Sequence, residues 1–138
     1  MKKTLVIVGL ISILLLPAML LACAGNINAS LGQEFTLPAG KTVEIKGESL
    51  SIKFIQVITD SRCPTGVECV WAGEATCRME INLNGVASER ILTISGGTSD
   101  KTQETVDQYT FSFKLEPYPQ AGKDIVPTDY YLLMTVTK

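Results

Sequence analysis

The residues most capable of chemistry gather in one short segment, residues 60–77, with the sequence DSRCPTGVECVWAGEATC. This segment holds three of the four cysteines and the one tryptophan, whereas the whole chain has no histidine. Thiols and carboxylates at this density can bind a metal, act in catalysis or form a disulfide. The spacing of these residues is the first means of choosing among the three.

Metal binding is poorly supported by that spacing. Zinc ligands are typically cysteine and histidine two to four residues apart, but five residues separate Cys63 from Cys69 and seven separate Cys69 from Cys77. The carboxylates Asp60, Glu68 and Glu74 are conceivable calcium ligands, yet they do not follow the alternating-oxygen pattern of an EF-hand loop. We therefore expect no metal, and the sequence indicates no other cofactor.

Catalysis by this segment also lacks its usual parts. A nucleophilic cysteine needs a base or a cationic neighbour, and only Arg62 is placed to lower the pKa of Cys63. There is no Cys-x-x-Cys redox pair and no Gly-x-Ser-x-Gly element. Glu68 and Glu74 are a possible acid–base pair, although acidic loop residues are usually just solvated. We expect no enzyme, and keep a carboxylate-based enzyme as the least favoured alternative.

Of the three interpretations, a disulfide requires the fewest additional groups. Cys63 and Cys69 flank the turn-forming Pro64-Thr65-Gly66, and an exported chain meets an oxidising compartment. Closing so short a loop stabilises a fold by roughly 2–2.5 kcal/mol. Cys77 shares its phase with apolar neighbours and is expected to be an unpaired core thiol. A bond from Cys77 to either other cysteine, or three reduced thiols, are the alternatives.

Trp71 has two interpretations. It precedes a predicted strand, where a tryptophan commonly plugs the core, or it is exposed in a binding loop. Asp60 and Arg62 are expected to pair with each other or with backbone groups and so to stiffen the loop. If the protein has a recognition surface, the candidate residues are Asp60, Arg62, Glu68, Trp71 and Glu74, with Tyr118 and the Gly96-Gly97 loop as weaker additions.

The N-terminal residues have the parts of an export signal. Lys2 and Lys3 precede an apolar run from Leu5 to Ala22. The run ends in Leu-Leu-Ala-Cys, which resembles the bacterial lipobox, although the second leucine is larger than usual. The resemblance implies a signal peptide over residues 1–22 and a lipid on Cys23, which would anchor the chain in the cell membrane or outer membrane. An uncleaved membrane-spanning helix is the alternative.

The rest of the chain is the size of one domain. Loss of residues 1–22 would leave 116 of the 138 residues, with a net charge of −4 instead of −2 because Lys2 and Lys3 are lost. A mildly acidic chain without a basic cluster is not expected to bind nucleic acid. Residues 23–32 are mostly small and polar and predict a flexible tether, followed by a domain over residues 33–138.

Apolar residues in this domain recur with a period of two, which is typical of strands. Tyr109, Phe111, Phe113 and Leu115 alternate, and Asn84-Gly85 predicts a tight hairpin. A change of phase after Phe54 indicates a bulge or a strand buried on both faces. The expected strands are 35–37, 43–45, 50–57, 75–83, 91–94, 109–115 and 131–136, with 101–108 as an edge strand or a loop. These seven or eight short strands predict an all-β fold, a single antiparallel β-sandwich with a barrel as the alternative.

The segment Asp-Ser-Arg-Cys-Pro, followed by Cys69 and Trp71-Ala72-Gly73, resembles a group of small exported bacterial proteins and lipoproteins. Those proteins also tend to carry a Pro-Tyr-Pro element, here Pro117-Tyr118-Pro119, and a tyrosine-led last strand. The resemblance covers most of residues 33–138. It implies an exported β-domain and no particular reaction.

Together these features predict a lipid-anchored lipoprotein of the cell envelope that is a non-enzymatic binding or interaction module. Its partners would be the lipid bilayer, through acylated Cys23, and an envelope protein, with no nucleic acid. An inhibitor of extracytoplasmic proteases or other enzymes is the second hypothesis. A disulfide-locked loop on a small sandwich is a suitable shape for entering an enzyme cleft.

Overall fold

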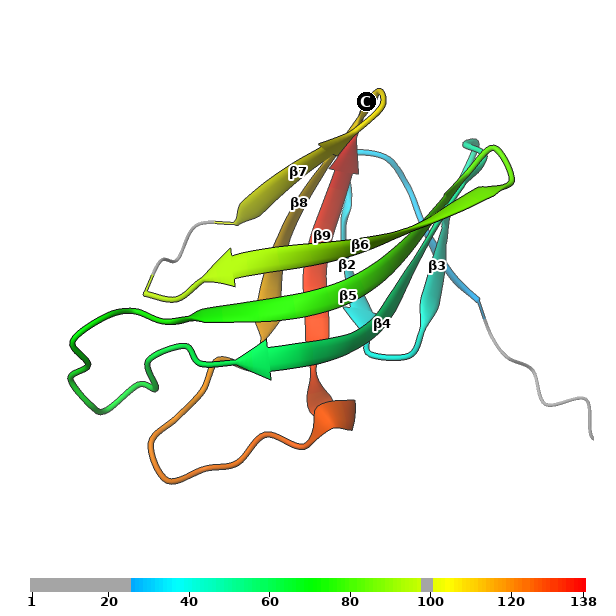
Figure 1. Cartoon of the computed structure of the whole chain (residues 1–138). Coiled ribbons are helices and arrows are strands. Elements are labelled where there is room, and N and C mark those ends of the chain that lie inside the picture. The colour runs from blue at the N-terminus through cyan, green and yellow to red at the C-terminus, as the bar shows by residue number, and fades with distance from the viewer. Residues whose placement is uncertain (1–25, 98–100) are drawn as a thin grey trace, which may run out of the picture.

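The structure, a computed structural model, describes residues 26–97 and 101–138 (Figure 1). These residues form nine strands and one short 3-10 turn, and no helix among them is long and apolar enough to cross a membrane. In chain order the elements are β1 (Ile27–Ala29), β2 (Glu34–Pro38), β3 (Thr42–Ile45), β4 (Leu50–Asp60), β5 (Glu74–Leu83), β6 (Val86–Ser95), β7 (Thr102–Val106), β8 (Tyr109–Glu116), η1 (Pro127–Asp129) and β9 (Tyr131–Thr137).

The strands form two sheets that face each other (Figure 1). One has five strands in the order β1-β3-β4-β5-β6, and the other has four in the order β2-β9-β8-β7. All neighbours are antiparallel except β1 and β3. The predicted all-β sandwich is confirmed, and the barrel alternative is not formed.

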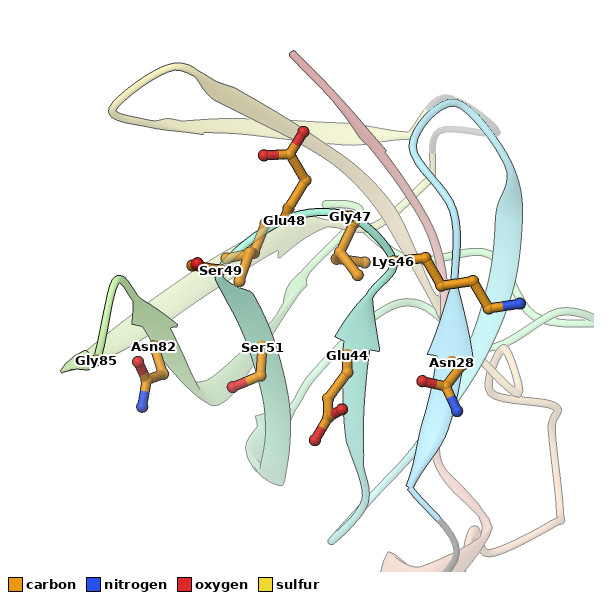
Figure 2. A pocket seen from close by; sticks show the side chains of 11 residues that line it. Asn28, Glu44, Lys46, Gly47, Glu48, Ser49, Ser51, Asn82 and Gly85 are labelled. Atoms are coloured by element: carbon orange, nitrogen blue, oxygen red, sulfur yellow. The ribbon is translucent and has the colours of Figure 1, made fainter.

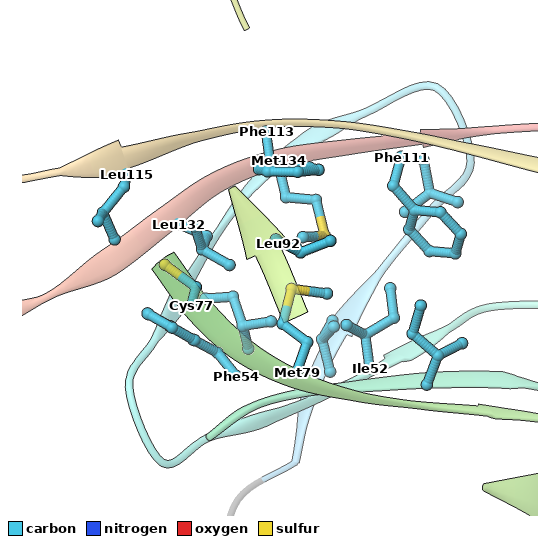
Figure 3. Close-up of a cluster of buried hydrophobic side chains, with 14 of the residues drawn as sticks. Ile52, Phe54, Cys77, Met79, Leu92, Phe111, Phe113, Leu115, Leu132 and Met134 are labelled. Carbon is cyan, nitrogen blue, oxygen red and sulfur yellow. The ribbon is translucent and has the colours of Figure 1, made fainter. Parts of the chain in front are cut away.

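The core lies between the sheets because alternate residues of each strand point inward. In β8 this alternation is regular, with Tyr109, Phe111, Phe113 and Leu115 all buried. Figure 3 shows how the two inner faces interlock. The five-stranded sheet supplies Ile52, Phe54, Cys77, Met79 and Leu92, and the four-stranded sheet supplies Phe111, Phe113, Leu115, Leu132 and Met134.

Two local predictions on the long strands are confirmed. Asn84 and Gly85 join β5 to β6 with positive φ angles of 53° and 82°, the conformation that a type I′ turn requires. The pairing of β4 with β5 shifts register between Phe54 and Gln56, so the phase change there is a bulge. Residues 55–59, which follow on β4, are half-buried or exposed, which rules out a strand buried on both faces.

The predicted tether over residues 23–32 is wrong for its second half. Ile27–Ala29 form β1, which pairs in parallel with β3, and Ala29 is 4% exposed. The backbone N–H of Gly32 also donates to the carbonyl of Val136 at 2.8 Å. Three residues are too few to show a period, and β1 is held by the backbone of β3, so the sequence pattern gave no sign of it. The predicted signal peptide and Cys23 lie outside the described residues.

Candidate functional site

Residues 61–73, which we call the pinned loop, connect β4 to β5 and project from one end of the sandwich (Figure 1). Cys63 and Cys69 are joined by a disulfide, with their Cα atoms 6.0 Å apart, as predicted. Cys77 is free and buried, so the alternative pairings through it are wrong. The disulfide therefore closes the tip of the loop and leaves its two ends to be held by other contacts.

Backbone hydrogen bonds hold those two ends. The N–H of Ser61 donates to the carbonyl of Glu74, and the N–H of Cys63 donates to the carbonyl of Ala72, both at 2.8 Å. These bonds continue the ladder of β4 and β5 beyond the last strand residues. The pinned loop is thus an extension of the sheet, and its first and last residues share the rigidity of the sheet.

Asp60 and Arg62 form a bidentate ion pair at the base of the loop. Arg62 Nε donates to Asp60 Oδ1 at 2.9 Å, and Arg62 Nη2 donates to Asp60 Oδ2 at 2.7 Å. Tyr130 adds its hydroxyl to Asp60 Oδ2 at 3.1 Å. The side chains of Arg62 and Asp60 are only 2% and 8% exposed. The expected pairing is confirmed, but neither side chain faces a ligand as a binding residue would.

The rest of the Arg62 guanidinium bonds to the opposite sheet. Nη1 donates to the carbonyl of Leu115 at 2.8 Å, and Nη2 donates to the carbonyl of Pro117 at 3.1 Å. The guanidinium carbon also lies 4.8 Å from the centre of the Tyr118 ring, which is within range of a cation–π contact. Arg62 therefore ties the pinned loop to the end of β8.

The buried ion pair gives a prediction for acid unfolding. Burial alone would raise the pKa of Asp60, but the hydrogen bonds and charge of Arg62 outweigh it and hold this pKa below its usual 3.8. A depressed folded-state pKa contributes stability above the unfolded-state pKa and loses it as the pH falls through the folded-state value. We expect the free energy of unfolding to drop on acidification from about pH 4 downward, and to drop less in Asp60→Asn.

Acid denaturation followed by circular dichroism checks this expectation. The comparison includes the variant Glu48→Gln, because Glu48 is a second carboxylate with a lowered pKa and contributes to the same acid unfolding. Hydrogen bonds from Tyr109 and Lys138 lower the pKa of Glu48. If Asp60→Asn and the wild type lose stability equally over the acid range, the ion pair makes no contribution to the pH dependence.

Two further segments brace the pinned loop from outside. The Tyr118 hydroxyl accepts a hydrogen bond from the N–H of Gly97 at 3.1 Å, and the N–H of Gly96 donates to the carbonyl of Gly73 at 2.8 Å. The weaker candidates, Tyr118 and Gly96-Gly97, therefore do lie beside the loop. The ring of Tyr118 thus contacts Arg62 of the pinned loop, while its hydroxyl bonds to Gly97.

The connection from β8 to β9 is hydrogen-bonded to Thr65, which lies within the loop that the disulfide closes. The N–H of Thr65 donates to the carbonyl of Pro119 at 2.9 Å, and the N–H of Ala121 donates to the carbonyl of Thr65 at 3.0 Å. These two bonds pair the turn inside the disulfide with a segment more than 50 residues later in the chain. The ladder thus joins the two arms of the pinned loop, the β8–β9 connection holds the first arm at Thr65, and Gly96 holds the second at Gly73.

Trp71 is exposed, so its interpretation as a core plug is wrong. Its exposed fraction is 79%. The physical reason is the extended ladder: Trp71 lies past the Cys63–Ala72 bond, on the part of the pinned loop that projects from the sandwich. The core at that end is already closed by Arg62. The alternative, a tryptophan exposed on the loop, is what the structure shows.

Trp71 belongs to an exposed apolar cluster that we call the apolar tip, formed by Val67, Val70 and Trp71. Their exposed fractions are 49%, 96% and 79%. The sequence reasoning missed the two valines as site residues. Their signal was available, because they are apolar residues in a loop bounded by cysteine and glycine, outside any alternating strand. A braced loop with an apolar tip has the form of a contact surface.

The acidic candidates do not form a chemical site. Glu68 and Glu74 are exposed, whereas Asp60 is occupied by Arg62 and Tyr130. Among residues 26–97 and 101–138, no three histidine, cysteine or acidic side chains are grouped closely enough to hold a metal ion. The loop therefore presents an apolar surface, and its acidic side chains do not form a group.

The free thiol gives a second prediction. Burial raises the pKa of Cys77 to about 12, and its side chain is fully buried, so the reactive thiolate is almost absent at neutral pH. We expect iodoacetamide to label Cys77 only in denaturant, and Cys63 and Cys69 only after reduction. Peptide mass spectrometry reads each site separately. Labelling of Cys63 or Cys69 without reductant would contradict the disulfide.

A hollow lies at the end of the five-stranded sheet opposite to the pinned loop (Figure 2). It has a volume of about 440 Å³ and is open to solvent. Asn28, Glu44, Ser51 and Asn82 are cross-strand neighbours, and they form one polar row on the outer face of the sheet. The row holds no aromatic side chain and a single carboxylate, which is ordinary for a solvated sheet face.

No protein-family model matches the chain, and neither a curated protein nor a solved structure shows significant similarity to it.

Proposed function

We propose that the protein is an exported lipoprotein, anchored in a membrane of the cell envelope through a lipid on Cys23, whose β-sandwich is a non-enzymatic binding module. The lipobox-like Leu-Leu-Ala-Cys and the resemblance of the Asp-Ser-Arg-Cys-Pro segment to exported proteins support the first part. One observation carries the second part: the apolar tip is held out into solvent by a loop fixed on both arms.

Rigidity is what separates this tip from a chance exposure of apolar residues. A binding loop that is already ordered loses little conformational entropy when it makes contact. Tryptophan is also among the residues that contribute most to contact energies. The disulfide, the Arg62 ion pair and the two bonds to Thr65 are arranged to supply this order.

The anchor is tested by replacing Cys23. In the full-length chain expressed in a bacterial host, we expect Cys23→Ala to leave the membrane fraction, because the acceptor of the lipid is lost. Mass spectrometry of the wild-type N-terminal peptide should show diacylglycerol on Cys23. An unmodified Cys23 in a membrane-bound wild type would overturn the lipid anchor in favour of an uncleaved helix.

The binding surface is tested by photo-crosslinking in cells. A photoreactive amino acid at Val70, in the apolar tip, is expected to give an adduct with a specific envelope component. The matched control is Val86, which is 70% exposed at the far hairpin and should give none. Equal adduct yields at the two positions would show that the tip is not a preferred contact.

A protease inhibitor is the second candidate, favoured by the same braced and disulfide-closed loop. An inhibitory loop must resist cleavage, and a loop held on both arms does so. Incubation of the protein with serine, cysteine and metalloproteases tests it directly. Slow cleavage of the chain by every protease, without loss of protease activity, would exclude this role.

A further inference from the structure

We propose that the partner of the apolar tip is a protein surface that carries basic side chains among apolar ones. This inference rests on the proposed function and names the chemistry of the partner that its binding surface takes. It comes from the distribution of charge and of exposed apolar residues over the domain, together with a small hollow beside the tip.

One end of the sandwich carries the whole net charge of the described residues. We call residues 60–74 and 117–129 the loop end, because the pinned loop and the β8–β9 connection are neighbours there, joined through Thr65 (Figure 1). Among the described residues, 13 acidic and 10 basic side chains give a net charge of −3. The loop end has five of the acidic and two of the basic side chains, and the remaining eight of each kind cancel. The loop end is therefore acidic, whereas the other described residues together are neutral.

The carboxylates of the loop end are open to a partner. Asp60 is neutralised by Arg62, but the other four are exposed and form no ion pair within the described residues, namely Glu68, Glu74, Asp124 and Asp129. Lys123, the one exposed cation of the loop end, donates to Gln120 Oε1 at 2.8 Å. The four charges are spread over the surface instead of gathered at one point, which suits a basic protein surface better than a single ion.

The exposed apolar side chains lie at the same end. Of the seven large ones among the described residues, four belong to the loop end and a fifth, Ile58, lies two residues before it; the four are Val67, Val70, Trp71 and Val126. Protein interfaces typically combine an apolar centre with a polar rim, and complementary charge selects the partner. The apolar tip would then supply contact area, and the carboxylates around it would select a basic surface.

A small hollow in the β8–β9 connection offers a place for one basic side chain. Its volume is about 210 Å³, which is below the range of about 300–1,000 Å³ that is usual for small-molecule sites. Its lining includes Tyr118 and Ile125 as apolar walls, with Asp124 and Asp129 against the single ammonium of Lys123. The methylene groups of a lysine or arginine from the partner can pack on such walls while the charged head meets the carboxylates.

A lipid bilayer fits this end less well than a protein does. Ile27, at the start of β1, is level with Val43, Ile52 and Ile81, which places it nearer to the far hairpin than to the pinned loop. Asp60 lies eight residues beyond Ile52 along β4, which is about 26 Å of strand. The start of the fold therefore does not bring the apolar tip to a membrane. Membrane surfaces that contain anionic lipids also attract basic protein surfaces and repel acidic ones.

A second copy of the chain is also a poorer partner. Contact between two loop ends would bring two surfaces of like charge together, which disfavours association. The other described residues together are neutral, so they offer no excess of positive charge to the loop end. The complementary surface is therefore expected on a different protein.

Photo-crosslinking from Val70 tests the inference in cells with the full-length protein. The variant Glu68→Gln/Asp124→Asn removes two charges of the loop end and keeps the shape of both side chains. Two exposed ion pairs correspond to roughly two- to thirtyfold in affinity, and we expect the yield of the Val70 adduct to fall with it. Peptide mass spectrometry should place the crosslink in a segment of the partner that has a net positive charge.

The matched control removes the same two charges elsewhere. In Glu80→Gln/Asp107→Asn both residues are exposed, form no ion pair within the described part of the chain and lie outside the loop end. Asp107 has a φ of 56°, a conformation that asparagine adopts readily. We expect this variant to keep the wild-type yield of the Val70 adduct.

Two synthetic peptides without tryptophan test the chemistry directly. They share their leucine and phenylalanine residues, and one carries lysine and arginine where the other carries glutamate. The full-length protein is held in phosphatidylcholine vesicles, with protein-free vesicles as the blank, and Trp71 is the one indole present. We expect the basic peptide to change the Trp71 emission and the acidic peptide to leave it unchanged. The response should weaken as salt rises from about 0.1 M to about 1 M, because the screening length then falls to about 3 Å.

Three results would overturn the inference. Equal Val70 yields in the two double variants show that the charge of the loop end does not select the partner. An equal response to the two peptides, including none to either, shows that the tip does not prefer basic surfaces. A crosslink from Val70 to lipid identifies the bilayer as the ligand. Each result can occur while Val70 still gives more adduct than Val86, so failure of the inference is distinguishable from failure of the proposed binding surface.

Discussion

Replacement of Arg62 by alanine is expected to lower the free energy of unfolding by about 3–5 kcal/mol, the range found when one partner of a buried ion pair is removed. The side chain of Asp60 would keep its charge at 8% exposure without its partner. The carbonyls of Leu115 and Pro117 would each lose a donor. These losses fall on one site because Arg62 joins both sheets and the pinned loop.

Urea denaturation followed by far-ultraviolet circular dichroism measures this loss. The matched control is Arg78→Ala, which removes an ion pair with Glu89 whose side chains are 41% and 56% exposed, and which we expect to cost about 0–1 kcal/mol. Arg62→Lys should fall between the two, because an ammonium cannot reproduce the planar bidentate contact. A loss for Arg62→Ala no larger than for Arg78→Ala would show that the buried pair does not hold this end of the fold.

The consequence for the binding surface is separate from stability. In molecules that stay folded, loss of Arg62 frees the ring of Tyr118 and with it the bond to Gly97. The disulfide would still close the tip. We therefore attribute the presentation of the apolar tip to two independent sets of interactions. One is the disulfide within the loop, and the other is the set of hydrogen bonds that Arg62 makes at its base.

The strands were predictable because local patterns dictate them. The alternation from Tyr109 to Leu115 can bury one face only as a strand, and Asn84-Gly85 suits the positive φ angles of a type I′ turn. The disulfide was predictable for a similar reason, since a turn-forming tripeptide separates the two cysteines by a short stretch of chain.

The environment of the site was not predictable because it depends on residues far apart in the sequence. Arg62 bonds to Leu115, 53 residues away, and no spacing rule connects the two. The wrong interpretation of Trp71 has the same origin. Whether a loop tryptophan is buried depends on where the opposite sheet ends, and the sequence pattern gives the strands without their relative placement.

Replacement of Gly73 by alanine is expected to lower the free energy of unfolding by about 2–5 kcal/mol. Gly73 has a φ of +69°, which costs a non-glycine residue about 1–2 kcal/mol. A Cβ atom there would overlap the carbonyl oxygen of Ser61 and lie 2.7 Å from its carbonyl carbon. Backbone cannot move aside as a side chain does, so the ladder between the two arms of the pinned loop must open.

Gly32→Ala separates the two contributions. Gly32 has a φ of +73°, but a Cβ there meets no atom within 4 Å, so only the backbone conformation is penalised and about 1 kcal/mol is expected. The difference between the two variants measures the close approach of Gly73 to Ser61. Equal losses would mean that this approach is loose and that the disulfide and Arg62 alone position the loop. A larger loss for Gly73→Ala would show that the tight backbone contact with Ser61 helps to hold the two arms of the pinned loop together.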